Sequence, residues 1–404
     1  MGPIETQSIR RFLGRQTGDL PQGAPGAPLF GILVEALLRP GHRLTLVTTD
    51  SQLMTQGRST VSSQLSEDGN LRIFYCPIRR RSFAIENGRL GRMWDFFRFE
   101  RKAMCEVLRE VKPDVVHAHW SYEYALAGLE SGLPVVVTCH DSPRQVLRFM
   151  PNLYRLGRYA MARKALRKAR VLTAVSPYLQ SELEHFASVP IRVIANPMPD
   201  ECFESDPSGV ERGAANALAP RVVMILNGWT SRKNPEPALI GFSQFRRSYP
   251  KAELHCFGAD LGPGEVADSW LQSRGVADGV ALHGRQPHST VLKELKQATM
   301  MVHPALEESC CMAIVEAMSL GIPVIGGAGS GGVPWQLDDG KAGLVVDVRS
   351  AEAISGAMNN LAADELFRQR TASAGFLRAK QLFSSSHVAA QYVESYREAV
   401  GLPS

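Results

Sequence analysis

The chain has 404 residues, which is too long for one hydrophobic core of ordinary size, so two domains are the first expectation. Apolar residues make up 44% and charged residues 21% of the chain, which excludes a disordered protein. The formal net charge of +5 is unevenly spread: residues 1–200 carry 27 Lys and Arg against 18 Asp and Glu, whereas the remainder carries 18 against 22. This basic first half indicates either an uneven solvated surface or an anionic partner such as membrane lipid or a phosphorylated acceptor.

No apolar run approaches the roughly 18 residues that a membrane-spanning helix needs. Residues 1–20 lack the apolar core of a secretory signal. The seven cysteines form neither a C-x-x-C pair nor a cluster at zinc spacing, which favours a reducing compartment without disulfides. We therefore expect a cytoplasmic protein, with peripheral contact at the inner face of the membrane as an open alternative.

Short β-branched runs alternate with helical patterns through the first 200 residues. Apolar runs such as residues 134–138 are typical of parallel strands that helices cover on both faces. Helices are predicted at residues 90–110 and 153–169. Strands are predicted at residues 44–48, 71–76, 114–117, 134–138, 171–175 and 191–194.

A polar stretch rich in Pro, Gly and acidic residues places a linker at residues 201–220. The alternation then restarts, with strands predicted at residues 221–226, 252–258, 279–282, 299–303, 322–325 and 343–346. We expect an α/β chain of two Rossmann-like, doubly wound domains, at residues 1–200 and 221–384. Ligands of such sheets bind at the carboxyl ends of the strands, here in a cleft between the domains. Residues 385–404 are expected to form a last helix that crosses back to the first domain.

The most informative stretch runs from His303 to Trp335. It leaves a predicted strand, passes through a loop with Glu307 and Glu308, and enters a helix for which Ser309 is a suitable N-cap. The first backbone N–H groups of a helix suit a diphosphate, and here they would be those of Cys310, Cys311 and Met312.

Glu316 follows Glu308 by eight residues, which separates the two by roughly 12 Å along a helix. This separation can bracket a nucleotide sugar, with one carboxylate near the sugar and the other near the ribose. It is too wide for the acid/base pair of a glycosidase, which needs about 5–9.5 Å. The alternative is that both are ordinary surface glutamates.

The E-x7-E spacing, followed by EAM at 316–318 and GIPV at 321–324, resembles the signature of glycosyltransferase family 4, of the GT-B fold. The similarity covers nearly all of the chain from Leu29 onward. Other matching pieces are PGHRLTLV (40–47), PDVVHAH (113–119), TCH (138–140), VS (175–176), NP (196–197), GWTSRKN (228–234) and GGVPW (331–335).

The resemblance implies a retaining transfer from a nucleoside-diphosphate sugar, without a metal or other cofactor, and the sequence has no D-x-D motif that would hold a divalent ion. Glu308 would lie against the donor sugar and Glu316 would bind the ribose. Lys233 matches the family's lysine that neutralises the diphosphate. Trp229 stands where the family has an arginine, so Arg232 is expected to substitute for it. Backbone groups at Gly228, Gly331 and Gly332 would complete the donor site.

On the acceptor side, His119 and His140 follow predicted strands, and the resemblance implies that a histidine here contacts the sugar or the acceptor. Gly23 and Gly26 stand where the family has a glycine-rich loop near the donor phosphates. The family opens with an apolar strand, whereas the apolar residues of 1–20 have a spacing nearer that of a helix. The alternative for both histidines is a structural, hydrogen-bonded role.

A basic amphipathic helix is predicted over residues 153–169, and it favours either a solvated surface or an anionic leaflet. A second basic and aromatic stretch spans residues 79–99. Neither belongs to a nucleic-acid reader motif, so no nucleic-acid partner is expected. Cys310 and Cys311 lack an identifiable base, so no cysteine nucleophile is predicted.

Together these patterns predict a hexosyltransferase that acts on a saccharide, lipid-linked or small-molecule acceptor in cell-surface polysaccharide or glycoconjugate biosynthesis. Two rivals stay open. The missing first strand, Trp229 and the Ser-Cys-Cys loop favour a nucleotide-sugar-binding homologue without turnover. A sugar-nucleotide epimerase of the same architecture would form product without an acceptor.

Overall fold

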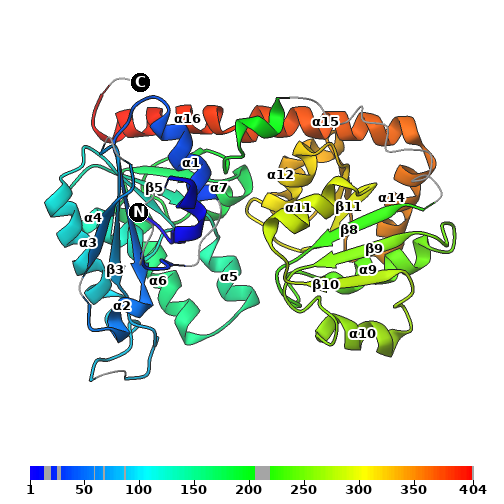
Figure 1. Cartoon of the computed structure of the whole chain (residues 1–404), viewed down its shortest axis with the longest axis horizontal. Helices are drawn as coiled ribbons and strands as arrows, with labels where there is room; N and C mark the ends of the chain where they lie inside the picture. Colours follow the sequence, from blue (N-terminus) through cyan, green and yellow to red (C-terminus); the bar gives the residue numbers. More distant parts are fainter. Residues whose placement is uncertain are drawn as a thin grey trace. The chain divides into compact units, whose positions relative to one another are not determined.

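The computed structural model describes residues 1–12, 20–24, 29–58, 60–66, 69–85, 88–204 and 219–402. The chain divides into two compact units, of which the first comprises Met1–Pro197 with Ser385–Ser404 and the second Met198–Ser384 (Figure 1). Both are α/β units with mainly parallel sheets. No helix among the described residues combines the length and the apolar character needed to cross a bilayer.

The first unit contains two sheets, ordered β1-β3-β2 and β4-β5-β6-β7. All neighbours are parallel except β2 and β3. Every predicted strand of this half overlaps an observed one, whereas β2 was not predicted. The strands are β1 (Leu44–Asp50), β2 (Val61–Gln64), β3 (Leu71–Pro77), β4 (Val116–His119), β5 (Val135–Cys139), β6 (Val171–Ala174) and β7 (Ile191–Val193).

Residues 1–4 lie between these two sheets. The Gly2 N–H donates to the Val47 carbonyl of β1 at 3.1 Å, and the His119 N–H of β4 donates to the Met1 carbonyl at 2.9 Å. The chain then forms a 3-10 helix, η1 (Thr6–Phe12), so the helix-like spacing predicted for residues 1–20 is confirmed over this part. Hydrogen bonds of residues 1 and 2 thus connect β1 with β4, at the place where this sequence lacks the apolar first strand expected from the family resemblance.

Helices of the first unit pack on both faces of the sheet that contains β1 and β3. One of them, α3, begins at Arg98 rather than at the predicted Leu90, because Phe96 and Phe97 have positive φ angles of 52° and 62°, which no α-helix accommodates. The last helix, α16, packs against α1 and belongs to this unit (Figure 1). The helices are α1 (Leu29–Leu38), α2 (Ser51–Thr55), α3 (Arg98–Val111), α4 (Glu123–Glu130), α5 (Pro143–Phe149), α6 (Leu153–Lys168), α7 (Pro177–Glu184) and α16 (Ser385–Ala399).

The second unit has one parallel sheet of six strands, ordered β10-β9-β8-β11-β12-β13. Each predicted strand of this half overlaps one of them. The strands are β8 (Arg221–Ile225), β9 (Glu253–Phe257), β10 (Val280–Gly284), β11 (Met300–His303), β12 (Val324–Gly327) and β13 (Leu344–Val346).

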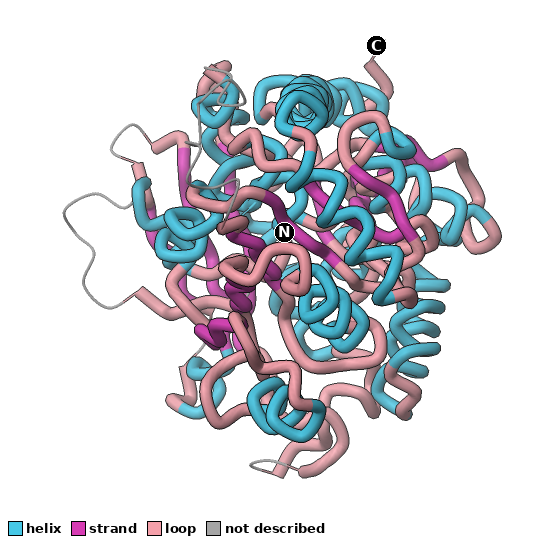
Figure 2. Tube along the Cα trace, turned by 90° about the vertical axis from the view of Figure 1, so that its right-hand side faces the viewer, coloured by secondary structure: helices cyan, strands magenta, loops and turns pink. Residues whose placement is uncertain are grey.

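Helices pack against this sheet, and Figure 2 shows the helices and strands of the chain from the side of this unit. The two helices α9 and α14 pack against each other on the face to which Val222 and Met300 contribute. The helices α12 and α15 also pack against each other. Its helices are η2 (Asp200–Phe203), α9 (Pro235–Phe245), α10 (Val266–Arg274), α11 (His288–Lys296), α12 (Met312–Ser319), α13 (Val333–Gln336), η4 (Asp338–Gly340), α14 (Ala351–Ala363) and α15 (Glu365–Phe383).

The strand order of this sheet reverses between β8 and β11. In open parallel sheets the connections after the two central strands leave in opposite directions, and the crevice between them binds ligands. The loops that follow β8 and β11 therefore meet at the switch point of the second unit.

Candidate functional site

The loop after β8, residues 226–234, is held at both of its ends. The Gly228 N–H donates to the Ala259 carbonyl at 3.2 Å, and the Trp229 N–H donates to the Asp260 carboxylate at 2.9 Å. At the other end the Asn234 side-chain amide donates to the carbonyls of Pro304 and Val348. The two cations between these anchors, Arg232 and Lys233, are therefore presented from a fixed loop.

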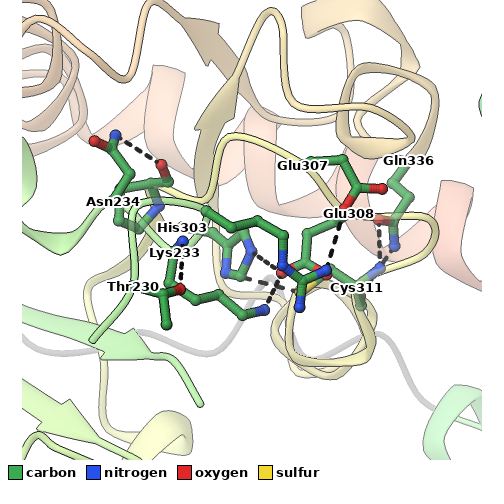
Figure 3. Close-up of polar contacts among 10 residues, drawn as sticks. Thr230, Lys233, Asn234, His303, Glu307, Glu308, Cys311 and Gln336 are labelled. Atoms are coloured by element: carbon green, nitrogen blue, oxygen red, sulfur yellow. Dashed lines mark hydrogen bonds and ion pairs between the residues drawn. The ribbon is translucent and has the colours of Figure 1, made fainter. Parts of the chain in front are cut away.

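Lys233 meets the first predicted glutamate. Its Nζ lies 2.5 Å from Glu308 Oε1, and His303 Nε2 lies 3.2 Å from the same oxygen (Figure 3). The three side chains are 12%, 14% and 2% exposed for Lys233, Glu308 and His303. One carboxylate oxygen thus joins the loops that follow β8 and β11.

The charges in this cluster support one another. Burial opposes ionisation of Glu308, but the His303 hydrogen bond and the Lys233 charge outweigh it and lower the pKa to about 2. Burial also opposes the cationic form of His303, but Cys311 and Glu308 outweigh it and raise the pKa to about 9. Glu308 is therefore a carboxylate at neutral pH, with cationic partners on two sides.

Arg232 pairs with the neighbouring glutamate. Its Nη1 lies 3.1 Å from Glu307 Oε2, and its carbonyl accepts the Leu306 N–H at 2.7 Å. Burial raises the pKa of Glu307, while the Arg232 charge opposes that shift. Both predicted cations therefore lie beside the carboxylates that follow β11.

The helix after this loop starts later than predicted. Its first residue is Met312 and its N-cap is Cys311, so the prediction that Ser309 caps it is wrong. The Cys311 N–H donates to Gln336 Oε1 at 2.9 Å, and the Cys311 carbonyl accepts from Gln336 Nε2 at 3.0 Å (Figure 3). The Cys311 N–H is thus already bonded, which contradicts its predicted availability for a diphosphate. Cys310, in the turn before it, is partly exposed.

The glycines after β12 lie against Glu308. Gly331 and Glu308 form an isolated parallel bridge, and the Gly332 N–H donates to the Glu308 carbonyl at 2.7 Å. Glu316 lies on α12, and its Oε1 contacts His288 Nε2 at 2.8 Å. This contact raises the pKa of His288. The structure therefore brings Gly331 and Gly332 to Glu308, which Lys233 and His303 also contact. Glu316 contacts His288 instead.

The two predicted histidines of the first unit contact each other. His119 ends β4 and His140 follows β5, and the atoms His119 Nδ1 and His140 Nε2 are 2.9 Å apart. Burial, with His117 and His140 nearby, holds the pKa of His119 well below its usual range. Burial also lowers the pKa of His140 to about 3. Both rings are consequently neutral near pH 7.

The predicted glycine-rich loop is described only in part. Gly23 has a φ of 77°, and its N–H donates to the Asp50 carboxylate at 2.8 Å. A side chain there would collide with the Ile4 carbonyl, because an added Cβ would lie 2.2 Å from that oxygen. Gly26 lies outside the described residues.

Of two basic residues expected on open surfaces, Arg79 is buried and Arg158 is partly buried. Arg158, on the predicted basic helix, pairs with Glu123 and lies over the Tyr122 ring at 3.7 Å from the centroid. Arg79 pairs with Glu100, whose side chain is fully buried. The exposed basic residues of the segment 153–170 are Arg163, Lys164, Arg167, Lys168 and Arg170.

Three contributors to the site were not predicted: His303, Asn234 and Gln336. His303 begins the stretch that contains Glu308, and the Trp that precedes Gln336 ends a matched motif, but neither pattern shows which side chain turns inward. His303 also lies 3.7 Å, by its Nδ1, from Cys311 Sγ. This contact corrects the prediction that no base accompanies the cysteines. Among the described residues, His303, Glu308 and Cys311 are the group close enough to hold a metal ion.

Two family models match the chain. Residues 32–201 match Glycosyltransferase Family 4, and residues 214–378 match Glycosyl transferases group 1. The N-acetyl-alpha-D-glucosaminyl L-malate synthase of Bacillus anthracis is 21% identical over 72% of this chain and 77% of its own length. The D-inositol 3-phosphate glycosyltransferase of Nocardioides sp. is 35% identical, but the match spans 25% of this chain and 22% of that relative.

Solved structures of similar fold extend the comparison. The sucrose-phosphate synthase of Thermosynechococcus elongatus superposes with a TM-score of 0.71 at 18% identity, over 94% of both chains. Anabaena Alr3699/HepE, in complex with UDP and glucose, gives a TM-score of 0.65 at 16% identity, over 94% of this chain and 98% of that one. The chain therefore belongs to glycosyltransferase family 4 and has its two-domain GT-B fold.

Proposed function

We propose that this protein transfers a hexose-type sugar from a nucleoside-diphosphate sugar to an anionic acceptor, with retention of the anomeric configuration. The observation that carries the proposal is the contact between Lys233 and Glu308 at the switch point of the second sheet. A cation at this position suits the diphosphate of a nucleotide sugar, and a carboxylate suits the hydroxyls of its sugar. Retention is taken from the family resemblance.

In the proposed reaction the bond between the sugar C1 and the diphosphate oxygen breaks, and the acceptor hydroxyl oxygen bonds to C1 on the same face. The hydroxyl proton leaves with the diphosphate. Lys233 and Arg232 neutralise the departing diphosphate, which is the largest charge that develops. Glu308 accepts hydrogen bonds from the sugar hydroxyls, and Glu316 accepts them from the ribose. When the donor binds, Lys233 must give up part of its contact with Glu308 and contact the diphosphate instead. Because protein cations supply this charge, no metal is required.

The donor and acceptor classes are proposed from relatives. The structure of Alr3699/HepE contains UDP and glucose, so UDP-glucose is the first donor to test. The names of two relatives contain D-inositol 3-phosphate and L-malate, which are both anions. The basic balance of residues 1–200 agrees with an anionic acceptor. His119 and His140 are the proposed acceptor-side residues.

Peripheral contact with an anionic membrane is a separate proposal. On α6 the apolar residues Leu153 and Leu156 are 73% and 52% exposed, and basic residues are exposed further along the same helix. A surface of this kind binds anionic lipid. Flotation with phosphatidylglycerol vesicles but not with phosphatidylcholine vesicles would support it, whereas no flotation with either would contradict it.

The central experiment is a thermal-shift screen against UDP, GDP, ADP and their sugars, because a ligand of the folded state raises the melting temperature. Turnover of the stabilising donor is then followed with inositol phosphate and malate, and NMR of the product reports its anomeric configuration. EDTA should leave turnover unchanged. Glu316→Ala should weaken nucleotide binding, whereas Glu308→Ala should lower turnover. Negligible effects of both variants would contradict the site.

Two outcomes would favour a different function. Tight donor binding without transfer or hydrolysis indicates a binding homologue. A changed sugar nucleotide that forms without acceptor indicates an epimerase.

A further inference from the structure

Three side chains of the second unit form a linear chain of contacts. Cys311 Sγ lies 3.7 Å from His303 Nδ1, and His303 Nε2 lies 3.2 Å from Glu308 Oε1 (Figure 3). His303 ends β11, Glu308 lies in the loop that follows, and Cys311 caps α12. A thiol, an imidazole and a carboxylate in this order are the arrangement that activates a nucleophilic cysteine.

The carboxylate fixes the proton on the imidazole. Glu308 is ionised and can only accept hydrogen bonds, so His303 must present Nε2–H to it. The other ring nitrogen, Nδ1, faces the sulfur, and the raised pKa of His303 favours a second proton on the ring, at this atom. His303 is thus placed to hold, at Nδ1, the proton that leaves the Cys311 thiol.

The end of α12 favours the charged product of this transfer. Cys311 is the N-cap of the helix, where the backbone dipole stabilises a negative charge. Gln336 holds the Cys311 backbone through two hydrogen bonds, which keeps the sulfur at its place beside the imidazole.

A metal centre fits these contacts less well. The sulfur and the carboxylate contact different nitrogens of the same ring, whereas a metal would need one nitrogen together with both of them. The Lys233 ammonium also contacts the carboxylate oxygen that would bind the ion. Arg232 and Glu307 add a further ion pair beside this cluster.

We propose that Cys311 is a reactive thiol, activated by His303 and Glu308, and that small oxidants and alkylating agents modify it selectively. With hydrogen peroxide as the oxidant, the thiol proton passes to His303 and the thiolate attacks one peroxide oxygen. The S–O bond forms as the O–O bond breaks, and the leaving hydroxide takes the proton from His303 and departs as water. Sulfur loses two electrons, peroxide gains them, and Cys311 becomes a sulfenic acid.

The consequence for ligand binding rests on the proposed function. An oxidised or alkylated Cys311 adds volume beside Glu308 and removes the proton acceptor role of His303. Modification would therefore lower the affinity for the donor, and a bound donor would shield the thiol. A cellular thiol that reduces the sulfenic acid would restore the site.

The other cysteines provide internal comparisons. Cys76, Cys139 and Cys256 are fully buried, whereas Cys311 is 7% exposed. Burial raises the pKa of Cys76 to about 12 and raises the pKa values of Cys139 and Cys256 as well. Cys202 is partly exposed, and burial together with Glu201 raises its pKa. Cys202 is therefore the matched thiol that is accessible but not activated.

The test measures the rate at which iodoacetamide labels each cysteine, by peptide mass spectrometry, in a Cys310→Ser background that separates the two adjacent thiols. At pH 7 we expect Cys311 to react at least about tenfold faster than Cys202, since the thiolate is the reactive form. His303→Gln should reduce the Cys311 rate by about tenfold and leave the Cys202 rate unchanged. Equal Cys311 rates in the two proteins would overturn the proposal.

A second measurement needs no change at His303 and stays informative if that variant does not fold. Between pH 7 and 8 the Cys202 rate should rise roughly tenfold, whereas the Cys311 rate should change by less than about twofold. Parallel pH profiles for the two thiols would overturn the proposal. So would one bound Zn²⁺ per chain that is lost in Cys311→Ser, since this result indicates a metal centre.

The donor distinguishes this proposal from the proposed function. If UDP-glucose slows the labelling of Cys311, both proposals are supported. If Cys311 reacts as expected but none of the nucleotide sugars slows its labelling, the proposal of a reactive Cys311 is supported. The assignment of the donor site beside Glu308 is then contradicted.

Discussion

The side-chain amide of Gln336 bonds to both backbone polar groups of Cys311. The Cys311 N–H donates to Oε1 at 2.9 Å, and Nε2 donates to the Cys311 carbonyl at 3.0 Å. Gln336 ends α13 and is fully buried. The first contact satisfies the Cys311 N–H, and the second adds to the Val315 N–H, which also donates to the Cys311 carbonyl at 3.3 Å. The pair of contacts ties the loop after β11 to the segment after β12.

Gln336→Ala should therefore destabilise the second unit. It leaves the Cys311 N–H without its partner, which costs about 1–3 kcal/mol, while the Cys311 carbonyl keeps only the Val315 N–H at 3.3 Å. Urea unfolding followed by tryptophan fluorescence measures the loss. Gln297→Ala, at an exposed position of the same unit, serves as the control. Equal unfolding midpoints for the two variants would show that the Gln336 contacts do not matter.

Lys233→Met should lower turnover by about 10²–10³, the usual effect of removing one group that stabilises developing negative charge. The apolar stem is retained, so packing against the loop changes little. Steady-state kinetics with the donor from the thermal-shift screen measure the effect. Lys341→Met is the control, because that side chain is 81% exposed. Unchanged kcat in Lys233→Met would remove Lys233 from the reaction.

The histidine pair of the first unit should make stability depend on pH. The folded-state pKa of His140, about 3, is below its unfolded value of 6.5, so the unfolded chain binds the extra proton between these limits. Stability is therefore fully present above pH 6.5 and is lost as the pH falls, by about 2 kcal/mol at pH 5. His119 acts in the same direction.

Melting temperatures at pH 7 and pH 5 measure this loss. His140→Gln should flatten the dependence, whereas His387→Gln, at an exposed position of α16, should leave it as in the unchanged protein. Identical pH slopes in all three proteins would contradict the assignment of a neutral, buried His140.

Arg79→Leu should destabilise the first unit by about 3–5 kcal/mol, because it leaves the Glu100 carboxylate buried without its partner. Arg79 also bonds to Asp95, so the turn before α3 loses a second contact. Arg80→Leu removes an exposed charge next to it and should have little effect. Denaturation by urea compares the two, and equal losses would place the stabilisation elsewhere.

The amino-acid sequence by itself determined where most strands and helices of this protein lie along the chain. Strands such as residues 134–138 are apolar throughout, and helices such as α6 begin after a side chain that caps them, here Asn152. These signals are local, so the alternation of strands and helices could be predicted in both halves. The motif that contains Glu308 and Glu316 could be found for the same reason, since its spacing is fixed within one segment.

Local patterns failed where a distant contact set the backbone. The predicted helix from Leu90 is interrupted because Phe96 and Phe97 adopt positive φ angles next to the buried ion pair of Arg79 and Glu100. Residues 1–4 show no strand pattern, yet they bond to β1 and β4. Neither outcome follows from hydrophobic periodicity.

Only the tertiary structure decided which polar groups meet. Lys233 and Glu308 are separated by 75 residues, and they come together because β8 and β11 are neighbours in the sheet. The same strand order places Gln336 on Cys311, while the end of β11 turns His303 toward the sulfur. A sequence shows the type of each charged or nucleophilic side chain, but its partners, and with them its ionisation, depend on contacts that form when the sheet assembles.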